Sequence, residues 1–230
     1  MEKSTKTLIG LIFATLFIVL AVITLAGMSY PNSFATVGVP ITSDYEYTIT
    51  ITPTSDLTNI SLLIPLPADN TGHDLGTPLM LTDTSDYPED WNLVLVGTPG
   101  EASYLKVTTP FLSAAPDGQG TILHASIPSD VIIPTRNPEN GAYLFGADLN
   151  QTPDMVIADP SRKIFAKFTT EPATITEIMA SCSGANSWWW FGSSSNAYTD
   201  YISTKIDGSI SGWLETTGTP ESGIGKYTII

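Results

Sequence analysis

An uncharged, apolar run of 20 residues near the N-terminus places the strongest constraint on how this chain can fold. Residues 8–27 read LIGLIFATLFIVLAVITLAG and contain no Asp, Glu, Lys or Arg. As an α-helix, such a run is about 30 Å long, which matches the hydrocarbon core of a bilayer. The run therefore predicts a transmembrane helix over 8–27.

Charges on either side of the run predict its orientation. Lys3 and Lys6 precede it, and few basic residues follow for a long distance. The positive-inside rule then places residues 1–7 in the cytoplasm and the rest of the chain outside the membrane, with 28–42 as a linker. We expect an uncleaved signal-anchor, because the apolar part of a cleaved signal peptide usually has about 7–15 residues. A small-x-small sequence at 33–35, the alternative cleavage site, lies well beyond the run.

A filament subunit is the alternative for the same run. Archaeal and type IV pilins also carry a long apolar N-terminal helix, and the run resembles theirs in hydrophobicity. The junction Lys6-Thr7-Leu8 departs from their processing site, which has Gly or Ala between a charged stretch and the helix. If the resemblance holds, the helix packs in a filament core instead of lipid, and the protein self-assembles.

Charge and cysteine content exclude several classes of function. The 230 residues include 9 Lys+Arg and 23 Asp+Glu, a net charge of -14. Removing Lys3, Lys6 and Glu2 leaves 7 basic and 22 acidic residues outside the membrane. Such a surface repels nucleic acids, which need clustered Lys and Arg, and it also repels anionic lipid headgroups. A single cysteine, Cys182, excludes an intrachain disulfide and a cysteine-rich metal site within one chain.

After the membrane run the periodicity is that of strands. Residues 45–52, YEYTITIT, alternate apolar and polar side chains, as a half-buried strand does. Residues 59–67 follow after a short turn, which suggests a hairpin with 45–52. Further short candidate strands are 91–97, 103–109, 120–128, 130–134, 163–170, 173–181, 205–215 and 225–230. With no amphipathic helix beyond the anchor, this pattern predicts a mostly β, antiparallel β-sandwich over 43–230. It forms either one domain or two small modules.

Acidic loops are candidate calcium sites. Asp83, Asp86, Glu89 and Asp90 cluster within eight residues, and the loop 68–74 is also acidic. Calcium prefers six to eight oxygen ligands from loops of this kind. The spacing does not match the EF-hand pattern, so solvated acidic turns are the alternative. No other cofactor is expected.

The sequence predicts no catalytic residues. His73 and His124 are the only histidines, and His124 lies in a predicted strand. No nucleophile elbow, phosphate-binding glycine loop or paired-histidine zinc motif is present. Two sequons, at Asn59 and Asn150, are candidate glycosylation sites outside the membrane.

The side chains of three consecutive tryptophans cannot all point to the same face of a strand. Trp188, Trp189 and Trp190 stand among Gly, Ser and Asn, with Tyr198 nearby. On a strand, alternation sends neighbouring side chains to opposite faces. We therefore expect at least one buried and at least one exposed tryptophan. The segment either packs in the core, presents an aromatic platform to sugars or a protein, or touches the outer leaflet, which the acidic charge disfavours.

These patterns together predict a single-pass protein of the cell membrane with its β domain outside. The few lysines, the many Thr and Asp residues and the N-terminal anchor are similar to those of many archaeal cell-surface proteins. The expected role is non-catalytic, through contacts with a surface protein or a glycan. The alternatives are the filament subunit and a carbohydrate-binding or hydrolase-associated surface module.

Overall fold

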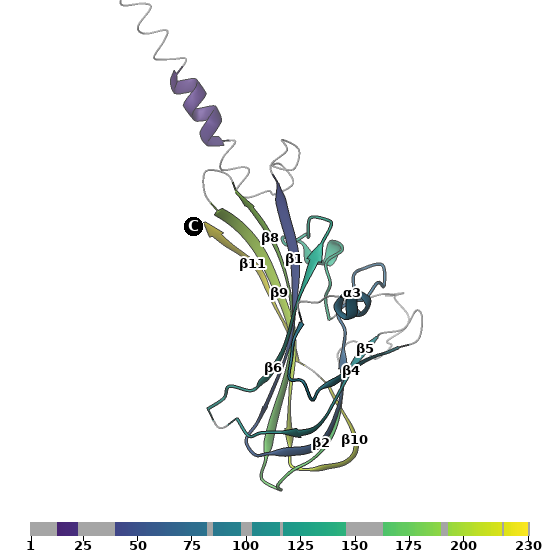
Figure 1. The fold of residues 1–230 in the computed structure, drawn as a ribbon. Coiled ribbons are helices and arrows are strands. Elements are labelled where there is room, and N and C mark those ends of the chain that lie inside the picture. The colour runs from purple at the N-terminus through teal and green to yellow at the C-terminus, as the bar shows by residue number, and fades with distance from the viewer. Residues whose placement is uncertain are drawn as a thin grey trace, which may run out of the picture.

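A computed structural model of the chain describes residues 13–22, 40–81, 85–97, 103–115, 117–145, 163–189, 193–217 and 219–229. Most of these residues form two antiparallel sheets, and one hydrophobic cluster contains residues of both. The predicted mostly β class with antiparallel sheets is confirmed, and the arrangement is consistent with a β-sandwich. Figure 1 shows the long strands of one sheet extending beyond the other sheet.

The larger sheet has six strands in the order β11-β9-β8-β1-β6-β3. Its members are β1 (Ile41–Pro53), β3 (Ser85–Asp86), β6 (Thr121–Ser129), β8 (Ile175–Trp189), β9 (Ser193–Asp207) and β11 (Thr219–Ile229). The 15-residue strands β8 and β9 pair along their whole length, from Ile175↔Asp207 to Trp189↔Ser193. At about 3.3 Å per residue each is about 50 Å long, which makes this sheet elongated.

The smaller sheet has five strands in the order β10-β7-β2-β5-β4. Its members are β2 (Leu57–Pro65), β4 (Asn92–Val96), β5 (Tyr104–Leu112), β7 (Lys163–Thr169) and β10 (Ile210–Thr217). It covers only part of the larger sheet, because its strands are at most nine residues long. One short helix, α3 (Gly76–Leu81), and one 3-10 turn, η1 (Pro138–Asn140), complete the described elements of the β domain.

The predicted hairpin between 45–52 and 59–67 is wrong. β1 pairs with β6 and β8, whereas β2 pairs with β5 and β7 in the other sheet. The link at 54–56 therefore carries the chain from one sheet to the other. A short turn with alternating flanks suits either connection, because both strands bury one face in the shared core.

Other boundaries also differ from the prediction. The candidate strand 130–134 is irregular, and the candidate strand 205–215 is two strands that meet at Gly208, which has a left-handed φ of 75°. β1 begins at Ile41, inside the predicted linker 28–42. The helix α3 was not expected, since six residues are too few to show a helical period.

The apolar run is described only in part. Residues 13–22 are helical, while 8–12 and 23–27 lie outside the described residues. Among the helices that the structure describes, none combines the length and the apolar character needed to cross a membrane.

Candidate functional site

The inner face of β8 and β9 changes character halfway along these strands. In the lower half it is apolar, with Ile178 on β8 and Ile202 on β9 fully buried in the core between the two sheets. In the half towards Trp189, most buried residues are small or carry polar groups, and Trp188 closes the end: Cys182, Gly184, Asn186, Trp188, Ser194, Asn196, Tyr198 and Asp200. This half does not face the smaller sheet but the irregular segment 131–145.

Buried side chains hold this segment by its backbone. The Asn186 amide donates to the carbonyl of Ile133 at 2.8 Å, and its Oδ1 accepts from the Ile133 N–H at 2.9 Å. Asp200 Oδ2 accepts from the N–H of Phe145 at 2.8 Å. An irregular segment cannot satisfy its own backbone groups when it is buried, so polar side chains of the sheet take the place of a pairing strand.

A second set of contacts closes the network across the strands. Asn186 Oδ1 also accepts from the Ser43 hydroxyl at 2.7 Å, and Asn186 Nδ2 donates to Asn196 Oδ1 at 3.0 Å. The Thr135 hydroxyl donates to the same Asn196 oxygen at 2.9 Å. The network fixes the upper ends of β1, β8 and β9 relative to one another.

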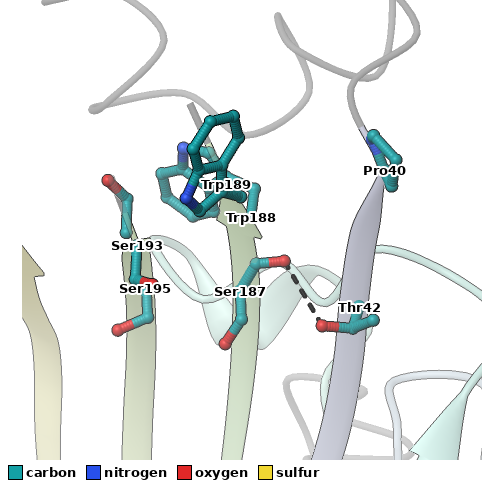
Figure 2. Close-up of a pocket in the computed structure, with 8 residues that line it drawn as sticks. Pro40, Thr42, Ser187, Trp188, Trp189, Ser193 and Ser195 are labelled. Atoms are coloured by element: carbon teal, nitrogen blue, oxygen red, sulfur yellow. Dashed lines mark hydrogen bonds between the residues drawn. The ribbon is translucent and has the colours of Figure 1, made fainter. Parts of the chain in front are cut away.

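Above this network the strand ends form a surface hollow of about 460 Å³. Figure 2 shows Pro40, just before β1, and Thr42 on β1 beside the two tryptophans at the end of β8, with Ser193 and Ser195 on β9. The Thr42 hydroxyl donates to the Ser187 carbonyl at 3.4 Å. The lining is therefore aromatic rings and hydroxyl groups, with no charged side chain among the described residues.

The predicted split of the tryptophans is confirmed. Trp188 is 4% exposed, and Trp189, the next residue on β8, is 69% exposed. Trp190 lies outside the described residues. β8 ends at Trp189 and β9 begins at Ser193, so the described tryptophans stand at the end of a long hairpin arm rather than on a loop of their own.

Tyr198 requires a correction, because it is not part of the exposed aromatic surface. It is 2% exposed, and its hydroxyl donates to the Tyr143 carbonyl at 2.7 Å. Burial raises the pKa of this phenol well above its ordinary value. Its ring packs over Gly184, where an added Cβ would lie 2.5 Å from a ring carbon. Tyr198 therefore positions the covering segment and cannot offer its ring to a ligand.

The proposed calcium ligands lie apart from this hollow. Asp83 is outside the described residues, Asp86 is in β3, and Asp90 accepts from the Thr109 hydroxyl at 2.8 Å. Glu89 is exposed in the intervening turn. No group of three metal-binding side chains comes together in the part of the chain that the structure describes.

In the other acidic loop, residues 68–74, the Asp69 carboxylate accepts hydrogen bonds from the loop itself. Asp69 Oδ1 accepts from the N–H and hydroxyl of Thr71 at 2.8 and 2.7 Å and from the N–H of His73 at 3.1 Å. Burial alone would raise the pKa of Asp69, but these hydrogen bonds bring it below its ordinary value. His124 lies on β6, as predicted.

Of the two predicted glycosylation sites, the structure describes only Asn59. Asn59 is exposed on β2 with a left-handed φ of 54°, at a point where the register between β2 and β7 shifts. Its side chain is therefore more accessible than its place in a strand suggested. Asn150 lies outside the described residues.

Comparisons with protein-family models, with curated proteins and with solved structures found no match to this chain.

Proposed function

We propose that this chain is a non-catalytic, membrane-anchored surface protein that holds an elongated β domain outside the cell. The observation that carries the proposal is the helix over 13–22. It exposes large apolar side chains, among them Phe13, Phe17 and Val22, and none of its residues belongs to the core cluster of the β domain. An apolar helix of this kind needs lipid or other helices around it.

The rest of the run extends this argument. Residues 8–27 are uncharged, follow Lys3 and Lys6, and precede a strongly acidic remainder. That asymmetry favours an N-terminus in the cytoplasm and a β domain outside. Contacts with other surface proteins have a candidate position at β4, a strand at the sheet edge with Val94, Leu95 and Val96 exposed. Edge strands with apolar residues are sites where proteins associate.

Protease digestion of intact cells tests the topology. Cells that express the full chain with one epitope tag before residue 1 and another after residue 230 are treated with protease from outside. We expect the C-terminal tag to disappear while the N-terminal tag remains on a short membrane-bound fragment. Protection of residues 40–230 in cells that stay intact would contradict the orientation.

Intact mass separates the anchor from the filament alternative. A mass that includes residues 1–7 indicates an unprocessed anchor, whereas a mass that begins near residue 8, together with filaments in the medium, indicates a pilin-like subunit. Mass additions at Asn59 or Asn150 would report glycosylation in the same measurement.

A further inference from the structure

The outer face of the smaller sheet carries a large share of the positive charge of this acidic protein. We define the basic face as six outward-pointing residues on four neighbouring strands: Leu63, Val94, Lys106, Lys163, Phe165 and Lys167. The register places Lys106 on β5 between Val94 on β4 and Leu63 on β2, and Leu63 pairs in turn with Phe165 on β7. Lys163 and Lys167 flank Phe165 and point the same way, because side chains alternate along a strand.

Charge distinguishes this face from the rest of the β domain. The described part of the β domain has six lysines and arginines, and three of them are on the basic face. Glu215 is the one acidic residue that the register of the described strands places there, and it pairs with Lys163 at 2.6 Å. The other described carboxylates near this sheet lie at its ends: Asp74 beside Ser103 at one, and Asp56, Asp90, Glu171 and Asp207 at the other. Lys106 and Lys167 therefore have no acidic neighbour in the described register.

Apolar and aromatic groups lie beside these lysines. Val94 is 44% exposed, and Leu63 and Phe165 are half-buried. The ring of Tyr104 packs edge-on against that of Phe165, with 5.8 Å between the ring centres. Five strands of up to nine residues, spaced by about 4.8 Å, give a face of roughly 500–600 Å². A stable interface buries about 800 Å² on each partner, so contact through this face is weak and depends on a high local concentration.

The larger sheet carries the opposite charge on its own outer face. Asp44 and Glu46 are two residues apart on the same side of β1. Exposed Asp86 on β3 pairs with His124, in the row of the sheet next to that of Glu46. We define the acidic face by the three carboxylates of Asp44, Glu46 and Asp86. Burial and the charge of Glu46 raise the pKa of Asp44, so a cation placed against this face would stabilise both carboxylates.

The basic residues in the described part of the larger sheet lie apart from the acidic face. Lys205 pairs with Glu177 at 3.6 Å, in the lower half of β8 and β9. Lys226 is on β11, three strands away from Asp44 in the register. The carboxylates of the acidic face are therefore not neutralised by the lysines of their own sheet.

The two charged faces lie at the same level on opposite sides of the domain. β1 runs toward the short link at 54–56, and β2 runs away from it. Glu46 lies seven residues before Pro53, and Leu63, beside Lys106, lies six residues after Leu57. Each is therefore about 20 Å from the link along its strand. The two sheets share one core, so their outer faces point in opposite directions.

We propose that copies of this protein associate side by side, with the basic face of one copy packed on the acidic face of the next. The two surfaces are complementary in charge, and sheet faces pack flat against each other about 10 Å apart. The contact is heterologous, so each copy keeps one free face and rows of copies form. Anchoring in one membrane supplies the high local concentration that a face of this size needs. The inference rests on the proposed function, because it names a second copy as the surface protein that the β domain contacts.

An anionic polysaccharide is the competing partner for the basic face. Its acidic groups would pair with Lys106 and Lys167 in the same way. A polysaccharide gives no role, however, to the carboxylates on the opposite side of the domain, whereas a second copy uses both faces. Two copies also repel each other through their net charge, but salt screens that long-range repulsion more than it weakens charges in direct contact.

Crosslinking between two cysteine variants of the full chain in phosphatidylcholine vesicles tests the contact. Thr108→Cys marks the basic face, two residues from Lys106, and Ser183→Cys marks the acidic face, opposite Glu46. Both positions are half-buried on outer faces, whereas the natural Cys182 is buried and does not compete. With a short bis-maleimide we expect at least about threefold more dimer from the mixed variants than from either variant alone.

Charge reversal then tests the complementarity. Lys106→Glu in the Thr108→Cys chain should lower the mixed crosslink at least about threefold, and Glu46→Lys in the Ser183→Cys chain should restore most of it. Arg136→Glu is the matched control, because it changes the net charge equally and Arg136 is exposed on the segment 131–145, away from both outer faces. This control should leave the crosslink unchanged. Thermal melts of every variant check that the fold is retained.

Equal amounts of dimer from the mixed and the single variants would overturn the contact, as would a Lys106→Glu loss that Glu46→Lys does not restore. A crosslink that is strongest for Thr108→Cys alone would replace it with a symmetric dimer. Binding of an anionic polysaccharide that needs Lys106, in a chain without the mixed crosslink, would assign the basic face to a glycan.

Vesicle flotation after a high-pH wash separates this inference from the anchor. A chain that floats without the mixed crosslink overturns the contact alone. A chain that does not float but crosslinks in detergent micelles overturns the anchor alone, and a chain that does neither overturns both.

Discussion

The buried amide of Asn186 gives the sharpest prediction for stability. It makes four hydrogen bonds to three partners, Ser43, Ile133 and Asn196, between 2.7 and 3.0 Å. Asn186 is fully buried, so the Asn186→Ala variant cannot replace these bonds with water without opening the structure. At about 1 kcal/mol for each net hydrogen bond, the loss is about 4 kcal/mol.

Two features move this figure in opposite directions. The N–H of Ile133 loses the Asn186 oxygen, whereas its carbonyl still accepts from the Thr135 N–H at 2.8 Å, and an unsatisfied buried group costs about 1–3 kcal/mol. Local opening of the segment 131–145 would let water reach the Ile133 N–H and recover part of that cost. We therefore expect Asn186→Ala to lower the free energy of unfolding by about 3–5 kcal/mol, a large share of the stability of an ordinary domain.

Urea unfolding of the full chain in detergent micelles measures the effect, with Ser187→Ala as control. Ser187 is the next residue on β8, faces the other way and is half-buried, so its replacement should change stability by less than about 0.5 kcal/mol. Trypsin provides a local readout, because Arg136 is exposed on the covering segment and follows Thr135 of the network. Cleavage at Arg136 should accelerate in Asn186→Ala under native conditions.

A small effect would refute the reasoning. If Asn186→Ala lies within about 1 kcal/mol of the natural sequence and Arg136 is cleaved at the same rate, the side chain does not hold the segment. If the variant changes the slope of the unfolding free energy against urea concentration but not the midpoint, the substitution has altered the unfolded state instead.

Three further variants test the packing around the same strands. Trp188→Ala should lower the free energy of unfolding by about 3–5 kcal/mol and Trp189→Ala by less than about 0.5 kcal/mol, and urea unfolding that gives equal losses would contradict the assigned directions. Gly184→Ala should cost about 1–3 kcal/mol in the same assay, because its Cβ would lie 2.5 Å from the Tyr198 ring; a neutral result would mean that the ring moves freely. Burial raises the pKa of Cys182 to about 12, so its thiol stays protonated at neutral pH. Its reaction with a disulfide reagent at about pH 8 should be slow in folded protein and rapid in urea, where the thiol is exposed and its pKa returns towards the ordinary value, and equal rates with and without urea would show an accessible thiol.

The sequence predicted the class of this fold because strand alternation survives in most of its strands. Residues 45–52 alternate in the structure as they do in the sequence, with Tyr45, Tyr47, Ile49 and Ile51 buried on one face. The pairing of strands could not be predicted in the same way. β1 and β2 are joined by a short turn, yet lie in different sheets, because local alternation records which face is buried and not which strand lies alongside.

The long arm formed by β8 and β9 was missed for a physical reason. Its upper half buries Gly184, Asn186 and Asn196, residue types that usually mark turns. They are buried here because they pack against the irregular segment 131–145, whose backbone N–H and carbonyl groups need hydrogen-bond partners. No pattern in a single sequence indicates such a neighbour. The same circumstance explains the wrong strand at 130–134: Ile133 packs against the arm without joining a sheet, and Val131 is exposed.

The position of the tryptophans connects this arm to the hollow at the strand ends. Trp188 is two residues from Asn186, on the same face of β8, so its buried ring lies at the end of the hydrogen-bonded network nearest to solvent. By excluding water from that end, it strengthens the bonds that hold the strand ends in place. Trp189 then projects from a rigid support rather than from a flexible loop. Such rigidity favours binding at the hollow, because an indole that is already ordered loses little entropy when a partner contacts it.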